Sequence, residues 1–163
     1  MTLTLILMRH AKSDSAHSGL ADHDRPLNAR GAGDAPAMGD WLRAQGYMPD
    51  EVLCSTATRT RQTLEGLSLT APVRFLPALY HADKDTMLET LQQATGKAVL
   101  MVGHNPGIAA FAADLLAHAP DHPRFDDYPT SATLVARFKI ESWSDLRWGT
   151  GRAEAFVIPA DLT

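Results

Sequence analysis

The chain has 163 residues, of which 45% are hydrophobic and 21% are charged. These values are typical of one globular domain with a sizeable apolar core, and they exclude a chain that is mainly disordered. The 15 basic residues are outnumbered by 19 acidic ones, so the net charge of −4 creates no overall field that would attract nucleic acid or anionic lipid. We therefore predict a single domain over residues 1–163, with neither nucleic acid nor a membrane as its partner.

The cysteine content and the first residues bear on the compartment. Cys54 is the single cysteine, so it forms no internal disulfide and builds no zinc cluster, which favours a reducing cytoplasm. The apolar run at residues 3–8 is too short to span a membrane and has no basic segment before it. We therefore expect this run to be a buried strand.

Taken in chain order, the remaining pattern alternates between strands and helices. Continuous apolar runs predict strands at 3–8 and 98–102, and shorter strands are predicted at 51–54 and 73–76. Helices are predicted at 29–45, where the apolar residues have helical spacing, and at 58–67, 85–94 and 108–117. Two β-rich segments at 133–140 and 153–158 are predicted to be antiparallel edge strands. This order predicts an α/β fold with three layers, α/β/α, around a largely parallel sheet.

Polar side chains follow three of the predicted strands. Arg9 and His10 come after the first strand, Arg59 lies one helical turn beyond the second, and His104 follows the fourth. In an open α/β sheet, ligands bind beyond the carboxyl ends of the strands, so these residues are expected to meet at one edge. The two long loops at 11–28 and 119–130 are candidates for the walls of that site.

These residue types favour binding of a phosphoryl group. An arginine presents a planar fork of donors that matches a phosphate, and helix N-termini add oriented N–H groups. His10 is then either a further phosphate ligand or a nucleophile, because nearby cations lower the pKa of an imidazole and keep it neutral. The nucleophilic interpretation requires that a backbone acceptor hold one ring nitrogen, so that the other faces the phosphate.

Four ordered motifs resemble those of the histidine phosphatase superfamily, which includes the phosphoglycerate mutases. They are MRHAKS at 8–13, DHDRPLNARG at 22–31, STATRTRQT at 55–63 and VGHNP at 102–106. The short length and the Asp-Arg-Pro-Leu segment are most similar to the SixA-type phosphohistidine phosphatases. The resemblance implies a phosphoglycerate mutase-like fold and a single histidine phosphatase domain over 1–163.

The resemblance also implies roles for individual residues. His10 corresponds to the phosphorylated nucleophile, Arg9, Arg59 and His104 to residues that bind the phosphoryl group, and Arg25 to a residue beside it. Ser13 of the first motif is counted with the phosphate-binding residues. The implied reaction uses no cofactor and no metal, and the implied substrate is a phosphohistidine protein or a small phosphorylated molecule.

Two positions depart from the family pattern. Ala11 stands where the superfamily usually has glycine, and Ala78 stands near the place where larger members have a carboxylate that donates a proton. An alcohol leaving group needs such an acid, whereas a protonated phosphoramidate nitrogen leaves readily. The substrate is therefore expected to contain a P–N bond or an activated ester, and the proton donor is Asp83, His81 or absent, with Tyr80 also nearby.

Other interpretations compete with this one. A hydrolytic metal site would need ligands from residues 10–24, but the sequence has no helical His-x-x-x-His pair there, and two arginines would repel a dication. Cys54 and Arg59 are one residue too close for the Cys-x5-Arg loop of cysteine phosphatases. Arg61 is expected to lie on a solvated helix face. A phosphate-binding module without turnover and a phosphomonoesterase acting on a small metabolite remain as alternatives. The candidate metal ligands are His10, His17, Asp22, His23 and Asp24.

Overall fold

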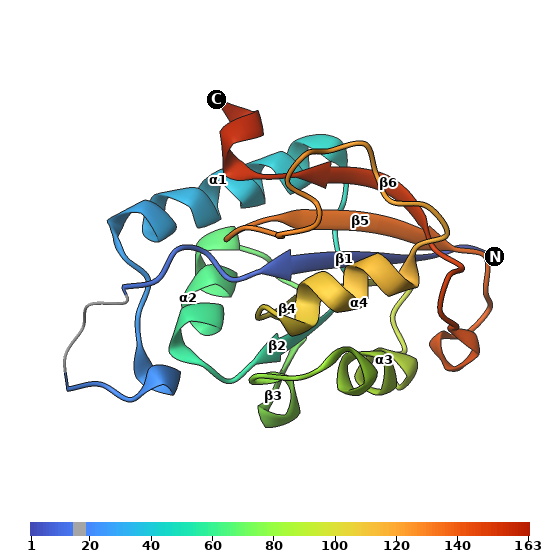
Figure 1. Cartoon of the computed structure of the whole chain (residues 1–163), viewed down its shortest axis with the longest axis horizontal. Helices are drawn as coiled ribbons and strands as arrows, with labels where there is room; N and C mark the ends of the chain where they lie inside the picture. The colour runs from blue at the N-terminus through green and yellow to red at the C-terminus, as the bar shows by residue number, and fades with distance from the viewer. Residues whose placement is uncertain (15–18) are drawn as a thin grey trace.

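The computed structural model describes residues 1–14 and 19–163, and in this part of the chain six strands form one sheet with helices on both faces (Figure 1). The strand order is β3-β2-β4-β1-β5-β6. The pairs β1·β4, β2·β4 and β2·β3 are parallel, whereas β5 is antiparallel to both β1 and β6. The predicted α/β class and its largely parallel sheet are therefore confirmed. The strands are β1 (Leu3–Arg9), β2 (Glu51–Ser55), β3 (Val73–Leu76), β4 (Ala98–Gly103), β5 (Thr133–Phe138) and β6 (Arg152–Val157).

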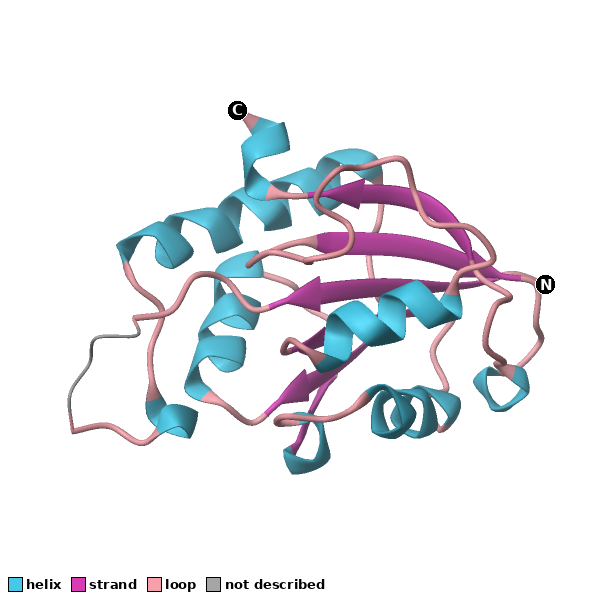
Figure 2. Cartoon of the chain, viewed as in Figure 1, coloured by secondary structure: helices cyan, strands magenta, loops and turns pink. Residues whose placement is uncertain are grey.

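Two helices cover each face of the sheet (Figures 1 and 2). Alternate residues of β1 point to opposite faces, so that Leu5 and Leu7 join the core beneath α3 and α4, while Ile6 and Met8 join the core beneath α1 and α2. Burial on both faces explains why β1 is apolar without alternation. In the described part of the chain, no helix is long and apolar enough to cross a membrane. The helices are α1 (Ala29–Gln45), α2 (Thr58–Leu67), α3 (Lys84–Gln92) and α4 (Gly107–Leu115).

The prediction that both C-terminal strands lie at an edge is wrong for the first of them. β5 lies between β1 and β6 and pairs with both, so β6 and β3 are the two edges of the sheet. Five of the six β5 residues are fully buried, because its side chains join the apolar cores on both faces of the sheet. A buried antiparallel strand and a buried parallel strand present the same apolar pattern, so hydropathy did not distinguish an interior position from an edge.

The helix ends differ slightly from their predicted positions because of local hydrogen bonds. α3 begins at Lys84 since the side chain of Asp83 accepts from the backbone N–H of Thr86 at 2.8 Å. α4 ends at Leu115 because Ala117 N–H donates to the carbonyl of Gly151 at 2.8 Å, so the chain leaves the helix to join a bridge with the segment before β6.

The carboxyl ends of the central strands lie level with one another. Arg9 at the end of β1 is in register with Gly103 at the end of β4, and the chain entering β5 returns to this edge. There the backbone N–H of Ser131 donates to the carbonyl of His10 at 3.0 Å, and that of Arg9 donates to Ala132 at 3.1 Å. The edge therefore gathers residues from β1, β2, β4 and the loop 119–130.

The segment after β1 is fastened to the start of α1. Asn28 caps α1 by accepting from the backbone N–H of Gly31 at 2.9 Å, and its own N–H donates to the carbonyl of Lys12 at 3.0 Å. A Cβ atom on Gly31 would lie 2.1 Å from that carbonyl, so only glycine fits at this contact. The close approach holds Lys12 beside the first turn of α1.

Candidate active site

His10 is a buried, neutral imidazole with one free ring nitrogen. Its Nδ1 lies 2.7 Å from the carbonyl oxygen of Ala11, and because a carbonyl only accepts, Nδ1 carries the proton and Nε2 keeps its lone pair. The side chain is only 6% exposed. Burial lowers the pKa of His10 to about 3, and the charges of Arg9 and Arg59 act in the same direction, whereas the bond to Ala11 opposes them. Desolvation therefore contributes more to the neutral state than the cations named in the sequence analysis.

His104 lies beside His10, with ring centroids 5.2 Å apart. Its Nε2 is 2.8 Å from the Ser55 hydroxyl at the end of β2. Burial again lowers the pKa of His104 to about 3, with smaller contributions from His10 and Arg59. Two neutral histidines therefore face one another across the ends of β1 and β4.

The arginines Arg9 and Arg59 lie next to these histidines. Arg59 is 3% exposed and donates to the backbone carbonyl of Asp22 at 2.8 Å. Arg9 donates to the carbonyl of Tyr128 at 3.2 Å. Burial lowers the pKa of Arg9, and repulsion from the charge of Arg59 acts in the same direction, whereas the charge of Asp127 raises it. An anion between Arg9 and Arg59 would relieve this repulsion.

Four buried polar atoms at this edge have no hydrogen-bond partner within residues 1–14 and 19–163. One is the Oγ atom of Ser131, and the other three are the Nε atoms of Arg9 and Arg59 and the Nδ1 atom of His104. A buried polar group without a partner costs about 1–3 kcal/mol, and native proteins contain few of them. The last three atoms belong to residues predicted to bind a phosphoryl group, and an oxyanion is the ligand that guanidinium donors prefer.

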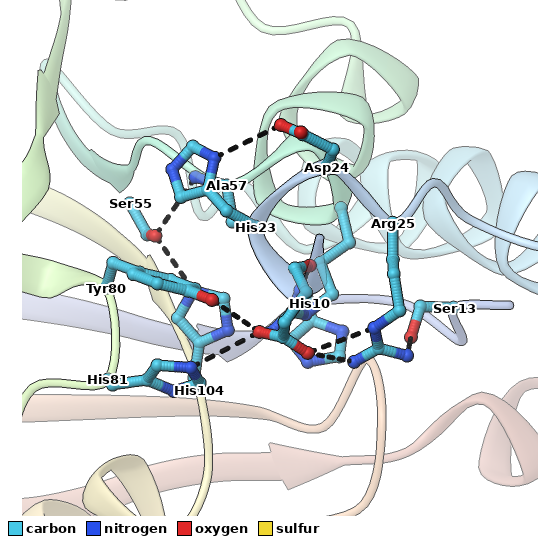
Figure 3. A network of polar contacts seen from close by, with 12 residues as sticks. His10, Ser13, His23, Asp24, Arg25, Ser55, Ala57, Tyr80, His81 and His104 are labelled. Carbon is cyan, nitrogen blue, oxygen red and sulfur yellow. Dashed lines mark hydrogen bonds and ion pairs between the residues drawn. The ribbon is translucent and has the colours of Figure 1, made fainter. Parts of the chain in front are cut away.

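Three side chains that lie near His10 and His104 in Figure 3, those of Arg25, Tyr80 and His81, all contact the carboxylate of Asp22. Asp22 lies 2.8 Å from Arg25, 3.1 Å from Arg59 and 3.2 Å from the His81 Nε2, and it accepts a hydrogen bond from the Tyr80 hydroxyl. The bond from Tyr80 and those from the two arginines hold the pKa of Asp22 well below its usual range. An ionised carboxylate of the chain itself therefore sits among the groups expected to bind phosphate.

Arg25 and Ser13 also come together in the structure. A terminal nitrogen of Arg25 lies 3.4 Å from the Ser13 hydroxyl and 3.4 Å from the carbonyl of Asp14. Ser13 pairs with Leu27 in an isolated antiparallel bridge, which brings the two sides of the first loop together. Ser13 thus positions the guanidinium of Arg25 beside Asp22.

The candidate proton donors lie at two different places in the structure. The Asp83 carboxylate caps α3, whereas Tyr80 and His81 have ring centroids 5.5 and 5.9 Å from that of His104. Ala78 is exposed in a short 3₁₀ turn before them. Tyr80 and His81 are therefore brought to the site, and the carboxylate of Asp83 is engaged elsewhere.

Cys54 and Arg61 lie apart from this cluster, and the candidate metal ligand His17 lies outside the described residues. Cys54 is fully buried in the core beneath α1 and α2, where burial raises the pKa of its thiol to about 12. Among the residues described, no group of three or more histidine, cysteine, aspartate or glutamate residues is arranged to hold a metal ion. Arg61 is exposed, donates to the carbonyl of Thr56 at 2.9 Å and covers the ring of Phe75 at 4.1 Å.

Two residues that the sequence analysis did not consider hold the loop 119–130 in place. Tyr128 donates from its hydroxyl to the carbonyl of Leu7 at 2.6 Å, and its own carbonyl accepts from Arg9. Asn105 donates from its side chain to the carbonyls of Asp127 and Tyr128 at 2.9 and 3.1 Å. Asn105 could have been suspected from its place after His104, but Tyr128 lies 119 residues from Arg9 and has no signal in the sequence.

The two buried histidines predict that stability falls in acid. His10 and His104 have a pKa near 3 in the folded chain against an ordinary value of 6.5, so the unfolded chain binds more protons between these limits. The free energy of unfolding should therefore decrease as the pH falls from about 6.5 towards 3, with a slope of at most about 1.4 kcal/mol per pH unit for each histidine. Urea denaturation at several pH values measures this slope.

The matching variants are H10Q and H104Q, each of which should reduce the slope, with H118Q as the control at an exposed histidine. A slope that is the same in all three variants would contradict the assignment of the neutral state to His10 and His104.

Comparison with known proteins identifies the family of this chain. The family profile of the histidine phosphatase superfamily (branch 1) matches residues 5–87. The protein Rv1276c of Mycobacterium tuberculosis, which is described as uncharacterized, is 40% identical over 93% of this chain and 99% of its own length. The phosphohistidine phosphatase SixA of Escherichia coli is 31% identical over 69% of this chain and 74% of its own.

Solved structures show the same fold over almost the whole chain. A protein from Nakamurella multipartitia that has been proposed to be the phosphohistidine phosphatase SixA superposes with a TM-score of 0.85 and 33% identity, covering 98% of this chain and 97% of that one. The protein histidine phosphatase SixA in complex with tungstate superposes with a TM-score of 0.80 and 25% identity, covering 99% and 100%. The motifs, the phosphoglycerate mutase-like fold and these relatives together show that the chain belongs to the histidine phosphatase superfamily and that it is similar to SixA-type members of it.

Proposed function

We propose that this protein is a phosphatase that hydrolyses its substrate through a covalent phosphohistidine intermediate on His10. The observation that carries the proposal is the neutral His10, whose Nε2 is unprotonated, next to three buried atoms of Arg9, Arg59 and His104 that have no partner among the described residues. Such a cluster supplies a nucleophile and an oxyanion site in one place. The whole chain acts as a single histidine phosphatase domain.

In the first step, the lone pair of His10 Nε2 attacks phosphorus, and the bond from phosphorus to the leaving atom breaks. The electron pair of that bond goes to the leaving atom, and the proton that this atom carries when it is released comes from solvent water. Arg9 and Arg59 meet the negative charge on the phosphoryl oxygens. The proton of His10 stays on Nδ1, and its hydrogen bond to the Ala11 carbonyl stabilises the imidazolium that forms.

In the second step, water attacks the phosphorus of phospho-His10 on the side opposite to the imidazole. The P–N bond breaks, its electron pair returns to Nε2, and the proton lost by water leaves with inorganic phosphate or with solvent. The Asp22 carboxylate leaves its place between Arg25 and Arg59 when the phosphoryl group binds, because the two anions would compete for the same donors.

The favoured substrate is phosphohistidine in a protein, or another phosphoramidate or small phosphate. The similarity to SixA supports this choice, as does the absence of a carboxylate at Ala78 and the engagement of Asp83 in the cap of α3. The direct test is a phosphate-release assay that compares a phosphohistidine peptide, a phosphoramidate and several phosphomonoesters. Binding of all of them without release of phosphate would favour a phosphate-binding module instead.

The leaving group should determine the rate on phosphomonoesters. Without a positioned acid, kcat/KM for an aryl phosphate should exceed that for a matched alkyl phosphate by a factor within the range of about 10²–10⁴ that a general acid supplies. The variant A78E should raise alkyl phosphate hydrolysis selectively, with A78Q as the uncharged control. Equal values for the two esters in the natural chain would indicate that His81 or Tyr80 donates the proton.

Turnover is expected to be independent of divalent metal ions. The charge on the transferred phosphoryl group is met by Arg9, Arg59, His104 and the N-termini of α2 and α4, which lie at the same sheet edge. Dialysis against excess chelator should leave the rate of 4-nitrophenyl phosphate hydrolysis within about twofold of its starting value. Loss of activity that zinc or manganese restores would refute the mechanism based on arginine.

A further inference from the structure

A separate cavity of about 320 Å³ borders Arg9 on a side that His10 does not line. Its walls come from the segment after β1, the first turn of α1, the end of the loop 119–130 and residues 158–160 at the C-terminus. The charged residues that line it are four cations and one carboxylate: Arg9, Lys12, Arg30, Arg124 and Asp127. Neither the motifs nor the proposed mechanism gives this cavity a role.

The positive charge of the cavity is only partly balanced. Arg124 pairs with Asp127 at 2.8 Å, and Arg30 has an acidic neighbour on α1, Asp34, at 3.4 Å. Lys12 and Arg9 form no salt bridge with any carboxylate of residues 1–14 or 19–163. The cavity therefore keeps an excess of positive charge next to the catalytic cluster, although the chain as a whole is acidic.

The positions of the cations are determined by the fold. The contact between Gly31 and the Lys12 carbonyl holds Lys12 at the first turn of α1, which also carries Arg30. On the opposite wall, the bonds from Asn105 to the carbonyls of Asp127 and Tyr128 hold the segment that carries Asp127. The cavity is thus built on anchored backbone.

We propose that this cavity binds a second anionic group of the substrate, a phosphate or a carboxylate, while the phosphoryl group to be transferred lies at His10. The inference rests on the proposed phosphatase function. Arg9 links the two places, because it precedes His10 in the chain and also lines the cavity. Substrates that carry a second anion a short distance from the scissile bond are then preferred over singly charged ones of the same size.

The second anion has two chemical sources that one experiment separates. It is either a further phosphate or carboxylate on a small molecule, or an acidic side chain close to a phosphohistidine in a protein. The small-molecule arm uses propylphosphonate and a series of α,ω-alkanediyl bisphosphonates of increasing length, which resist hydrolysis. The peptide arm uses phosphohistidine peptides that differ only by glutamate or glutamine near the phosphorylated residue.

Binding is measured by titration calorimetry on the intact protein and three variants. In the natural chain, one bisphosphonate length should bind more tightly than propylphosphonate. K12A should weaken the binding of that bisphosphonate by about tenfold, which is the effect of one charge-assisted hydrogen bond. The affinity for propylphosphonate should be almost unchanged. D127N should strengthen the binding of the bisphosphonate, since it removes the carboxylate of Asp127 from the cavity wall. The control for net charge is R74A, which removes an arginine of β3.

The results that test the second anion site can be distinguished from those that test the phosphatase activity. Equal affinity for propylphosphonate and every bisphosphonate, or a loss in K12A that is the same for both ligands, would overturn the second anion site. For the peptides, kcat/KM that is higher with glutamate than with glutamine would assign the site to a protein substrate, provided that K12A weakens this preference and D127N strengthens it. Absence of turnover on every phosphorylated compound, with bisphosphonate selectivity intact, would refute the phosphatase and leave the site standing.

Discussion

Replacement of His10 by alanine is expected to lower kcat on every phosphorylated substrate by at least about 10⁴-fold and to remove the covalent intermediate. The reason is that His10 supplies the attacking lone pair, and no other described histidine at the site combines a backbone-bound Nδ1 with a free Nε2. Rapid quenching of the natural protein with labelled substrate should trap an adduct that is labile in acid and stable in base. The same experiment on H10A should trap none.

The control for this experiment is H118A, which removes an exposed histidine that lines a separate cavity. It should form the adduct at the rate of the natural chain. An H10A protein that is folded and turns over at nearly the natural rate would show that His10 is a ligand rather than the nucleophile.

Replacement of Arg59 by alanine is expected to lower kcat by about 10²–10³-fold, which is the effect of removing one donor to a developing oxyanion. Arg59 is the most buried arginine of the cluster, and its Nε has no partner among the described residues. R9A should have a similar effect, because the Nε of Arg9 is also buried and has no partner among the described residues. Steady-state kinetics with an aryl phosphate measures both.

Two further variants separate charge, geometry and stability at Arg59. R59K keeps the charge but loses the planar fork, so it should recover only part of the rate. R61A removes an exposed arginine two residues away and should change kcat by less than about twofold. Thermal unfolding shows whether R59A remains folded after its bonds to Asp22 are lost. Greater sensitivity at Arg61 than at Arg59 would mean that the groups at the start of α2 have been assigned wrongly.

Much of the fold could be predicted because its signals are local. The apolar run of β1 and the helical spacing of α1 and α2 depend on neighbours within a few residues, and their predicted limits lie within one residue of the observed ones. The order of strand and helix then implied a parallel sheet, whose carboxyl ends bring Arg9, Arg59 and His104 together. The position of β5 required knowledge of which strands pair, and its hydropathy does not contain that information.

The sequence by itself determined the α/β class, and it predicted the edge of the sheet where the candidate site lies and the residue types that gather there. Only the tertiary structure decided the state of those residues. The pKa of His10 depends on its burial, and the contacts of Asp22 with Arg59 and Tyr80 join residues 37 and 58 positions apart. Local hydropathy and hydrogen bonding determine helices and strands, whereas burial and charge at a site are set by groups that meet only after the chain has folded.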